Sequence, residues 1–184
     1  CYVIYSDEPV YLEQLTDCFE VSRNTIFSDL KTVSKQLKQY DLELEYQPQI
    51  GYRIVGDSVR IRALFIMFFN EMYALFQSSA FSFFNPNVIK EYYEILKEIE
   101  NELGVNYVDG IMFSLAALIP VLYRHRKPVI FPGLKSEQVQ KTVEYKLVKK
   151  YFGDLIIEEQ CYLALHLLGS RVNICLLYTS DAAD

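Results

Sequence analysis

Apolar side chains recur at helical spacing between residues 23 and 38. Ile26, Leu30, Val33 and Leu37 fall at i, i+4, i+7 and i+11, so they lie on one face of a helix. Ser22 directly precedes this stripe, and its hydroxyl can cap the helix by accepting a hydrogen bond from a backbone N–H one turn on. At about 100° per residue, the opposite face carries short polar side chains first and lysines further along, namely Asn24, Ser28, Lys31, Thr32 and Lys35. The pattern predicts an amphipathic helix whose polar face is either solvated or placed against a partner.

The segments on either side of this helix predict the rest of a small domain. Residues 10–19 predict a supporting helix, and the side chains that we expect to point inward from it are Leu12, Leu15 and Phe19. Residues 42–46 alternate apolar and polar positions, Pro48 interrupts the alternation, and residues 51–56 resume an extended pattern, which predicts a hairpin. Two helices followed by a hairpin are typical of a winged helix-turn-helix.

In a helix-turn-helix the second helix enters the major groove of DNA, where small hydrogen-bonding side chains face base edges and lysines approach phosphates. The predicted base contacts are therefore Asn24, Thr25 and Ser28. The predicted phosphate contacts are Arg23, Lys31 and Lys35 from the helix and Arg53 from the hairpin. An arginine beside a hairpin is as often simply solvated, so the prediction for Arg53 rests on the position of this residue alone.

Residues 1–56 resemble the winged-helix domain of the Mga type, which occurs in bacterial transcriptional regulators similar to the mannitol and lichenan operon activators. The resemblance is carried by two groups of residues together, and either group alone is weak. The first group is Val21-Ser22-Arg23, Thr25 and Asp29-Leu30. The second is Gly51-Tyr52, Ile54, Gly56-Asp57 and Arg60. The resemblance implies a protein that binds double-stranded DNA.

Residues 57–85 are dense in apolar side chains and predict a linker helix. A membrane-spanning helix needs about 20 apolar residues, whereas the uninterrupted apolar run here covers only residues 63–69. Because a helix that is apolar almost all round is buried or pairs with another chain, we expect this helix to pack against the next domain and to contribute to a homodimer. No membrane association is expected.

Residues 86–174 follow a purely helical pattern, with predicted helices at residues 88–103, 107–124, 136–152 and 157–172 and a loop at residues 125–133. This organisation resembles the PTS regulation domain, the helical module that usually follows such a winged helix. The supporting residues are Leu122-Tyr123-Arg124 and the segment from Glu159 to Leu167. The expected fold is therefore mainly α, a winged helix-turn-helix followed by a helical bundle.

The family resemblance implies control by phosphorylation of histidine, with phosphocarrier proteins of the sugar phosphotransferase system as donors. His166 corresponds to the second histidine of the family, and Arg124 and Arg171 could steady a phosphoryl group there. The chain departs from the family at the first histidine position, which is Ala117, and His125 lies in a basic loop. A lone histidine on an apolar helix is more often a core side chain, and this alternative remains open for His166.

Charge and composition modify this interpretation. The net charge is −6, and residues 1–56 hold nine acidic and five basic side chains, which argues mildly against nucleic-acid binding. We interpret this domain as a weak DNA binder that needs dimerisation or a second reading head. The four cysteines are scattered, so they are expected to be reduced thiols of a cytoplasmic protein. We find no motif for an enzyme active site, a metal site or a cofactor.

The ends of the chain also carry expectations. The sequence begins without an initiator methionine, inside an apolar segment, and predicts no signal peptide. Residues 175–184 resemble the conceptual translation of a transposase adapter used in sequencing libraries. We therefore expect a fragment in which both domains are truncated and the last ten residues carry no biology.

The leading hypothesis is a DNA-binding transcriptional regulator, an activator of carbohydrate-uptake genes, that is controlled by phosphorylation at His166 and is not an enzyme. One alternative is a Mga-like virulence-type regulator that does not respond to phosphohistidine, which Ala117 favours. Another alternative is a helical protein-interaction module that no longer binds DNA, which the acidic residues 1–56 favour.

Overall fold

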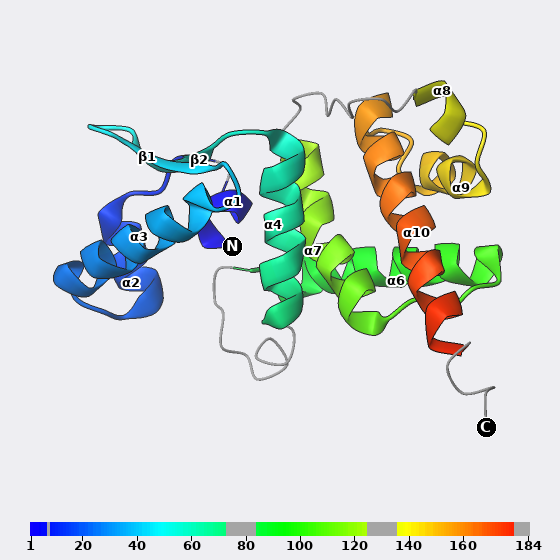
Figure 1. The fold of residues 1–184 in the computed structure, drawn as a ribbon, viewed down its shortest axis with the longest axis horizontal. Helices are drawn as coiled ribbons and strands as arrows, with labels where there is room; N and C mark the ends of the chain where they lie inside the picture. Colours follow the sequence, from blue (N-terminus) through cyan, green and yellow to red (C-terminus); the bar gives the residue numbers. More distant parts are fainter. Residues whose placement is uncertain (7, 73–83, 125–135, 179–184) are drawn as a thin grey trace. The chain divides into compact units, whose positions relative to one another are not determined.

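The computed structural model describes residues 1–6, 8–72, 84–124 and 136–178, with side chains up to residue 170. The mainly helical fold is confirmed, and the chain divides into two compact units, Cys1–Asn85 and Pro86–Asp184 (Figure 1). The elements of the first unit are α1 (Tyr2–Tyr5), α2 (Leu12–Phe19), α3 (Arg23–Lys38), β1 (Glu43–Gln47), β2 (Gly51–Val55) and α4 (Ser58–Glu71). Those of the second are α6 (Pro86–Leu103), α7 (Asp109–Arg124), α8 (Ser136–Val139), α9 (Val143–Tyr151) and α10 (Ile157–Tyr178).

Helix α3 contributes to two apolar clusters in the first unit. Near its N-terminus Ile26 packs with Val10 and Leu15, and near its C-terminus Leu37 packs with Leu42 and Leu64. The predicted core positions Ile26, Leu30 and Leu37 are confirmed, since each lies in or against one of these clusters. The core thus holds the helix at both ends.

Two predicted core positions are wrong. Val33 is 38% exposed, because it lies on the stretch of α3 between the two clusters. Phe19 is 43% exposed, because it is the last residue of α2, before Glu20 turns the chain in the left-handed conformation. The ring of Phe19 instead meets the ring of Tyr2 edge-on, with centroids 6.2 Å apart.

The predicted hairpin is confirmed as the antiparallel pair β1 and β2, in a register that runs from Glu43 opposite Val55 to Gln47 opposite Gly51. Val10 extends the pair, because its N–H and C=O both bond to Tyr52, at 2.8 Å each. Gly51 has a φ of +108°, and a Cβ there would lie 2.8 Å from the carbonyl oxygen of Val10. The close approach of these two backbones therefore requires glycine at position 51.

The segment that we expected to be a linker contributes its helix to the first unit. Asp57 caps α4 by accepting a hydrogen bond from the N–H of Arg60 at 3.0 Å. Leu64 belongs to the apolar cluster around Leu37 and Leu42, with Ile61 and Phe68 packed against it. Over the described parts of the chain, no helix combines the length and apolar character that crossing a membrane requires.

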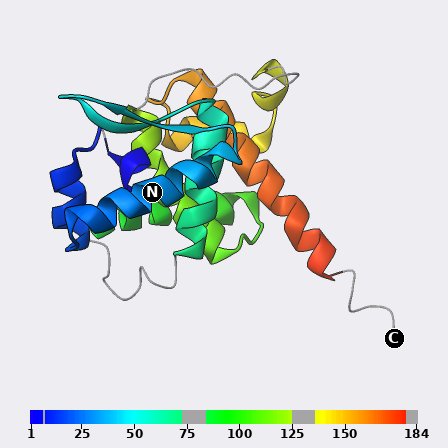
Figure 2. The same cartoon turned by 60° about the vertical axis from the view of Figure 1, so that its left-hand side comes forward.

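The second unit is a helical bundle in which α6 packs against α7 and α9, and α10 packs against α7, α8 and α9. The single helix predicted for residues 136–152 is wrong, because the chain forms the two helices α8 and α9 there. Thr142 causes the break, since its hydroxyl donates to the carbonyl of Val139 and accepts from the N–H of Tyr145. Helix α10 continues to Tyr178, beyond the predicted end, and Figure 2 shows its last turns extending past the other helices of the unit. The loop predicted at residues 125–133 lies outside the described residues.

Candidate nucleic-acid interface and regulatory histidine

The start of α3 is fixed by the predicted cap. The hydroxyl of Ser22 accepts a hydrogen bond from the N–H of Thr25 at 3.2 Å. The hydroxyls of Ser22 and Thr25 also lie 2.8 Å apart, within hydrogen-bond distance. Thr25 is therefore engaged in the cap and is rotated about 100° from Asn24 and about 60° from Ser28, so the structure does not bring it together with the other predicted base contacts.

Four of the predicted contacts share one exposed face of α3. Asn24, Ser28, Lys31 and Lys35 fall at i, i+4, i+7 and i+11, and all four side chains are exposed. This face lies opposite Ile26 and Leu37, which anchor the helix in the core. Among the described residues neither Lys31 nor Lys35 has an ion-pair partner. The arrangement presents two uncompensated cations next to two short hydrogen-bonding side chains.

Arg23 has a partner on the supporting helix. Its guanidinium forms an ion pair with the carboxylate of Glu13 in α2, and the two side chains are 62% and 60% exposed. Ion pairs exposed to this degree contribute little to stability, so a phosphate could displace Glu13 at low cost. The predicted phosphate contact Arg23 thus lies at the N-terminal end of α3 and is neutralised in the free protein.

Arg53 is neutralised in a similar way on the hairpin. It lies directly opposite Glu45 in the strand register, and its Nε donates to Oε2 of Glu45 at 2.7 Å. The hydrogen bond from Arg53 lowers the pKa of the Glu45 carboxyl below its usual value. Both side chains lie on the face away from Leu44 and Ile54, which face the core. The face of Leu44 and Ile54 also carries the ring pair Tyr46 and Tyr52, with centroids 4.7 Å apart.

Sequence reasoning missed both glutamate partners. The Glu45–Arg53 pair could have been predicted, because the turn fixes the register of the two strands and this register places the two residues opposite each other. The Glu13–Arg23 pair depends on how α2 packs against α3, which no local pattern specifies. Phe27 was also missed, although it is a large apolar residue outside the apolar stripe of α3 and is 46% exposed.

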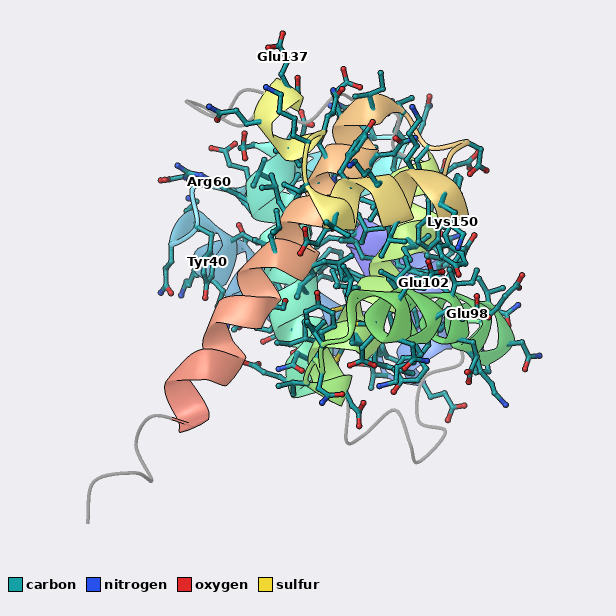
Figure 3. All side chains as sticks on the ribbon, turned by 90° about the vertical axis from the view of Figure 1, so that its right-hand side faces the viewer. Tyr40, Arg60, Glu98, Glu102, Glu137 and Lys150 are labelled. Carbon is teal, nitrogen blue, oxygen red and sulfur yellow. The ribbon has the colours of Figure 1, made fainter. Side chains whose placement is uncertain are left out.

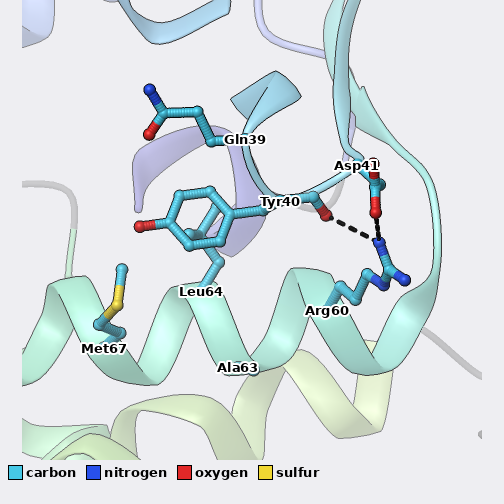
Figure 4. A pocket seen from close by; sticks show the side chains of 7 residues that line it. All are labelled: Gln39, Tyr40, Asp41, Arg60, Ala63, Leu64 and Met67. Atoms are coloured by element: carbon cyan, nitrogen blue, oxygen red, sulfur yellow. Dashed lines mark hydrogen bonds and ion pairs between the residues drawn. The ribbon is translucent and has the colours of Figure 1, made fainter. Parts of the chain in front are cut away.

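A shallow pocket of about 320 Å³ lies where α3 ends beside α4 (Figure 4). Its wall is largely apolar, with Leu64 and Met67 rising from α4 toward the ring of Tyr40. At one end the guanidinium of Arg60 pairs with the carboxylate of Asp41 and donates to the carbonyl of Tyr40. Because this arginine is already compensated, the pocket presents no free charge to a ligand.

His166 lies on α10 of the second unit and is partly buried, and Leu163 and Leu167 of the same helix are fully buried. Its ring centroid lies 4.6 Å from that of Tyr162, one turn earlier. Burial lowers the pKa of His166 to about 4. The imidazole is therefore neutral near pH 7, and in this state one ring nitrogen carries a lone pair.

Of the two arginines expected to steady a phosphoryl group at His166, the structure describes the side chain of Arg124. Ala117 is fully buried on α7, among the buried residues that run from Ser114 to Ile119. The Nε of Arg124 donates to the carbonyl of Pro120 at 3.0 Å. His125 and the side chain of Arg171 lie outside the described residues.

Charged contacts elsewhere in the second unit join its helices. Lys150 on α9 pairs with Glu102 on α6 at 2.7 Å, and both are marked in Figure 3. The buried carboxylate of Glu100 accepts from the N–H of Tyr107 at 2.6 Å. These contacts serve the packing of α6, α7 and α9. In the portion of the chain that the structure covers, no three histidine, cysteine, aspartate or glutamate side chains gather closely enough to hold a metal ion.

Comparison with known proteins assigns the first unit. Residues 2–69 match the model of the Mga helix-turn-helix domain, so the Mga-type resemblance is confirmed for this part of the chain. Over 92% of its length the chain is 20% identical to the "Probable licABCH operon regulator" of Bacillus subtilis (strain 168). The chain spans 28% of the length of that relative. The matched range extends through most of α4, in agreement with the packing of this helix in the first unit.

Proposed function

We propose that this chain is the part of a transcriptional activator of carbohydrate-uptake genes that binds double-stranded DNA through α3 and is controlled through its helical second unit. The observation that carries the proposal is the exposed face of Asn24, Ser28, Lys31 and Lys35 on the second helix of a Mga-type helix-turn-helix domain. Small polar side chains near the N-terminus of such a helix suit base edges, and the lysines beyond them suit phosphates.

The acidic balance of residues 1–56 limits what one copy can do. Electrostatic attraction to phosphates supplies most non-specific affinity for DNA, and here Arg23 and Arg53 are compensated by Glu13 and Glu45. A homodimer that reads two half-sites would add the affinity that one domain lacks. The similarity to a relative named as an operon regulator supports the proposed role in transcription.

The binding proposal is tested with the full chain and a pool of random duplex DNA. Repeated selection should enrich a sequence of defined pattern, and its affinity should fall steeply with added salt. If selection enriches no sequence, and the affinity for duplex DNA stays low and independent of salt, the chain is a protein-interaction module instead. The pairing of Arg23 and Arg53 with carboxylates is the observation that favours this alternative.

Control of the second unit is proposed to run through His166. A neutral imidazole nitrogen can attack the phosphorus of a carrier's phosphohistidine, so that an N–P bond forms at His166 and the carrier's imidazole leaves. The added charge of about −1.5 to −2, as on other phosphorylated side chains, would then lie on a partly buried side chain of a helix whose residues Leu163 and Leu167 are fully buried. Because apolar neighbours cannot solvate that charge, the helices must repack.

The control proposal is tested by incubating the full chain with the phosphocarrier proteins of a sugar phosphotransferase system and labelled phosphoryl donor. Acid-labile phosphate should appear on the wild-type chain and be absent from His166→Ala, while His125→Ala keeps the label. Phosphate that persists in His166→Ala would exclude this site. A wild-type chain that accepts none would favour a Mga-like regulator without phosphohistidine control, to which the buried Ala117 already points.

A further inference from the structure

Phe27 is the one large apolar side chain on the candidate DNA-reading face of α3 among the residues that the structure describes. Asn24 precedes Phe27 by three residues and Lys31 follows it by four, so these two side chains neighbour the ring on the helix surface, while Ser28 lies about 100° further round. All four side chains are exposed, and Phe27 is exposed to 46%. The phenyl ring is therefore bracketed by the side chains that the proposed function assigns to DNA.

The fold itself does not use this ring. Phe27 belongs to neither of the two apolar clusters that hold α3 in the first unit. Within the described ranges it also forms no contact with another aromatic ring. Single exposed apolar residues are common on protein surfaces, but this one lies in the second turn of the helix, where recognition helices reach base edges. A solvent-exposed phenyl at that position is suited to an apolar group on the DNA.

We propose that Phe27 is a specificity-determining residue that contacts the C5-methyl group of thymine in the major groove. The inference rests on the proposed DNA-binding function and deepens it. The thymine methyl is the apolar group that base pairs display in the major groove, and phenylalanine is among the side chains that contact it. Phe27 offers no hydrogen bond, so it can distinguish bases only through such a contact. Asn24 beside it offers the amide that pairs with adenine, so an A·T-containing step would satisfy both side chains.

The test replaces thymine by deoxyuridine, which removes only the methyl group. A duplex is first selected from a random pool with the full wild-type chain, and each thymine is then replaced in turn. At one or two positions the wild-type affinity should fall about fourfold, which corresponds to one buried methyl group. Phe27→Ala should bind the thymine duplex about tenfold more weakly, as expected for the loss of a half-buried ring, and should not respond to deoxyuridine at those positions.

Two matched variants separate this contact from other effects. Phe27→Leu keeps an apolar side chain and should keep the response to deoxyuridine. Val33→Ala removes another exposed apolar side chain from the opposite side of α3 and should keep both affinity and response. Circular dichroism and the melting temperature should match the wild type in every variant, because Phe27 lies outside both apolar clusters.

Three results would overturn the proposal. The first is a wild-type affinity that no deoxyuridine substitution changes, which leaves DNA binding intact and removes only the role of Phe27. The second is a Phe27→Ala variant that keeps the full response or changes only the oligomeric state of the chain, which would assign the ring to a protein contact. The third is the failure to select any duplex, which would overturn the DNA-binding proposal together with this one.

Discussion

Arg53 and Glu45 face each other across the β1–β2 hairpin, and two nitrogens of the guanidinium approach the same carboxylate oxygen, at 2.7 and 2.6 Å. The same kind of pairing occurs between Arg23 and Glu13 at the start of α3. Both arginines that the sequence predicted to contact phosphates are thus compensated in the free protein, whereas Lys31 and Lys35 have no such partner among the described residues. Acidic side chains of the first unit thus neutralise the two arginines of the candidate interface but not its two lysines.

This arrangement predicts that the glutamates restrain DNA binding. Glu45→Gln keeps the shape of the side chain but removes the charge that competes with phosphate for Arg53. We expect higher affinity for the selected duplex and a salt dependence that is steeper by about one released counterion. Glu43→Gln is the matched control, because Glu43 is an exposed acid on the same strand that lies opposite Val55. Equal effects of the two substitutions would show that only net charge matters.

The two lysines of α3 should supply phosphate contacts regardless of sequence. Replacing both Lys31 and Lys35 with Ala should weaken binding to all duplexes and reduce the salt slope by about two. The control replaces Lys146 and Lys149, two exposed lysines of α9 in the other unit, and should leave binding unchanged. An unchanged slope in the α3 variant, measured by titration at several salt concentrations, would mean that another element reads the DNA.

The comparison of sequence with structure separates local from non-local information. The Ser22 cap, the core positions Ile26, Leu30 and Leu37 and the hairpin depend on residues close in sequence, and these were predicted correctly. The exposure of Val33 was not, because periodicity shows which face is apolar but not where along the helix the core ends. At Thr142 a local signal was overlooked. Its two hydrogen bonds end α8 and start α9, although the apolar periodicity used for the prediction continues across the break.

The candidate sites divide in the same way. The shared face of Asn24, Ser28, Lys31 and Lys35 follows from helical spacing alone and could be predicted. The partner of Arg23 could not, since Glu13 lies ten residues away on another helix. His166 was chosen by family resemblance, and only the structure shows that its imidazole lies beside the ring of Tyr162 and is desolvated.

Gly51 should be essential for joining the N-terminal segment to the hairpin. In Gly51→Ala the new Cβ would approach the Val10 carbonyl at 2.8 Å, at a φ of +108° that other residues rarely adopt. We expect a loss of about 2 kcal/mol or more in the free energy of unfolding of the first unit. Gly104→Ala is the control in the second unit, since Gly104 has a φ of +64° but open space around its Cβ position. The free energy of unfolding of that unit should fall by only about 1 kcal/mol. Urea titration followed by circular dichroism measures both, and equal losses would mean that the backbone contact is not tight.

The titration of His166 gives the most direct view of its surroundings. Its pKa is lowered from 6.5 to about 4 by burial, so the unfolded chain binds a proton between these values that the folded chain does not. The free energy of unfolding should therefore fall as the pH drops from about 6.5 to about 4, by on the order of 2 kcal/mol. His166→Leu should lose this part of the pH dependence, while carboxylates shared by both proteins contribute equally to each. The imidazole resonances in NMR provide the second measurement, with His125→Ala to assign them, because the chain holds two histidines. A His166 resonance that titrates near pH 6.5 would mean that water reaches the ring, and phosphate could then be accommodated without any repacking of α10.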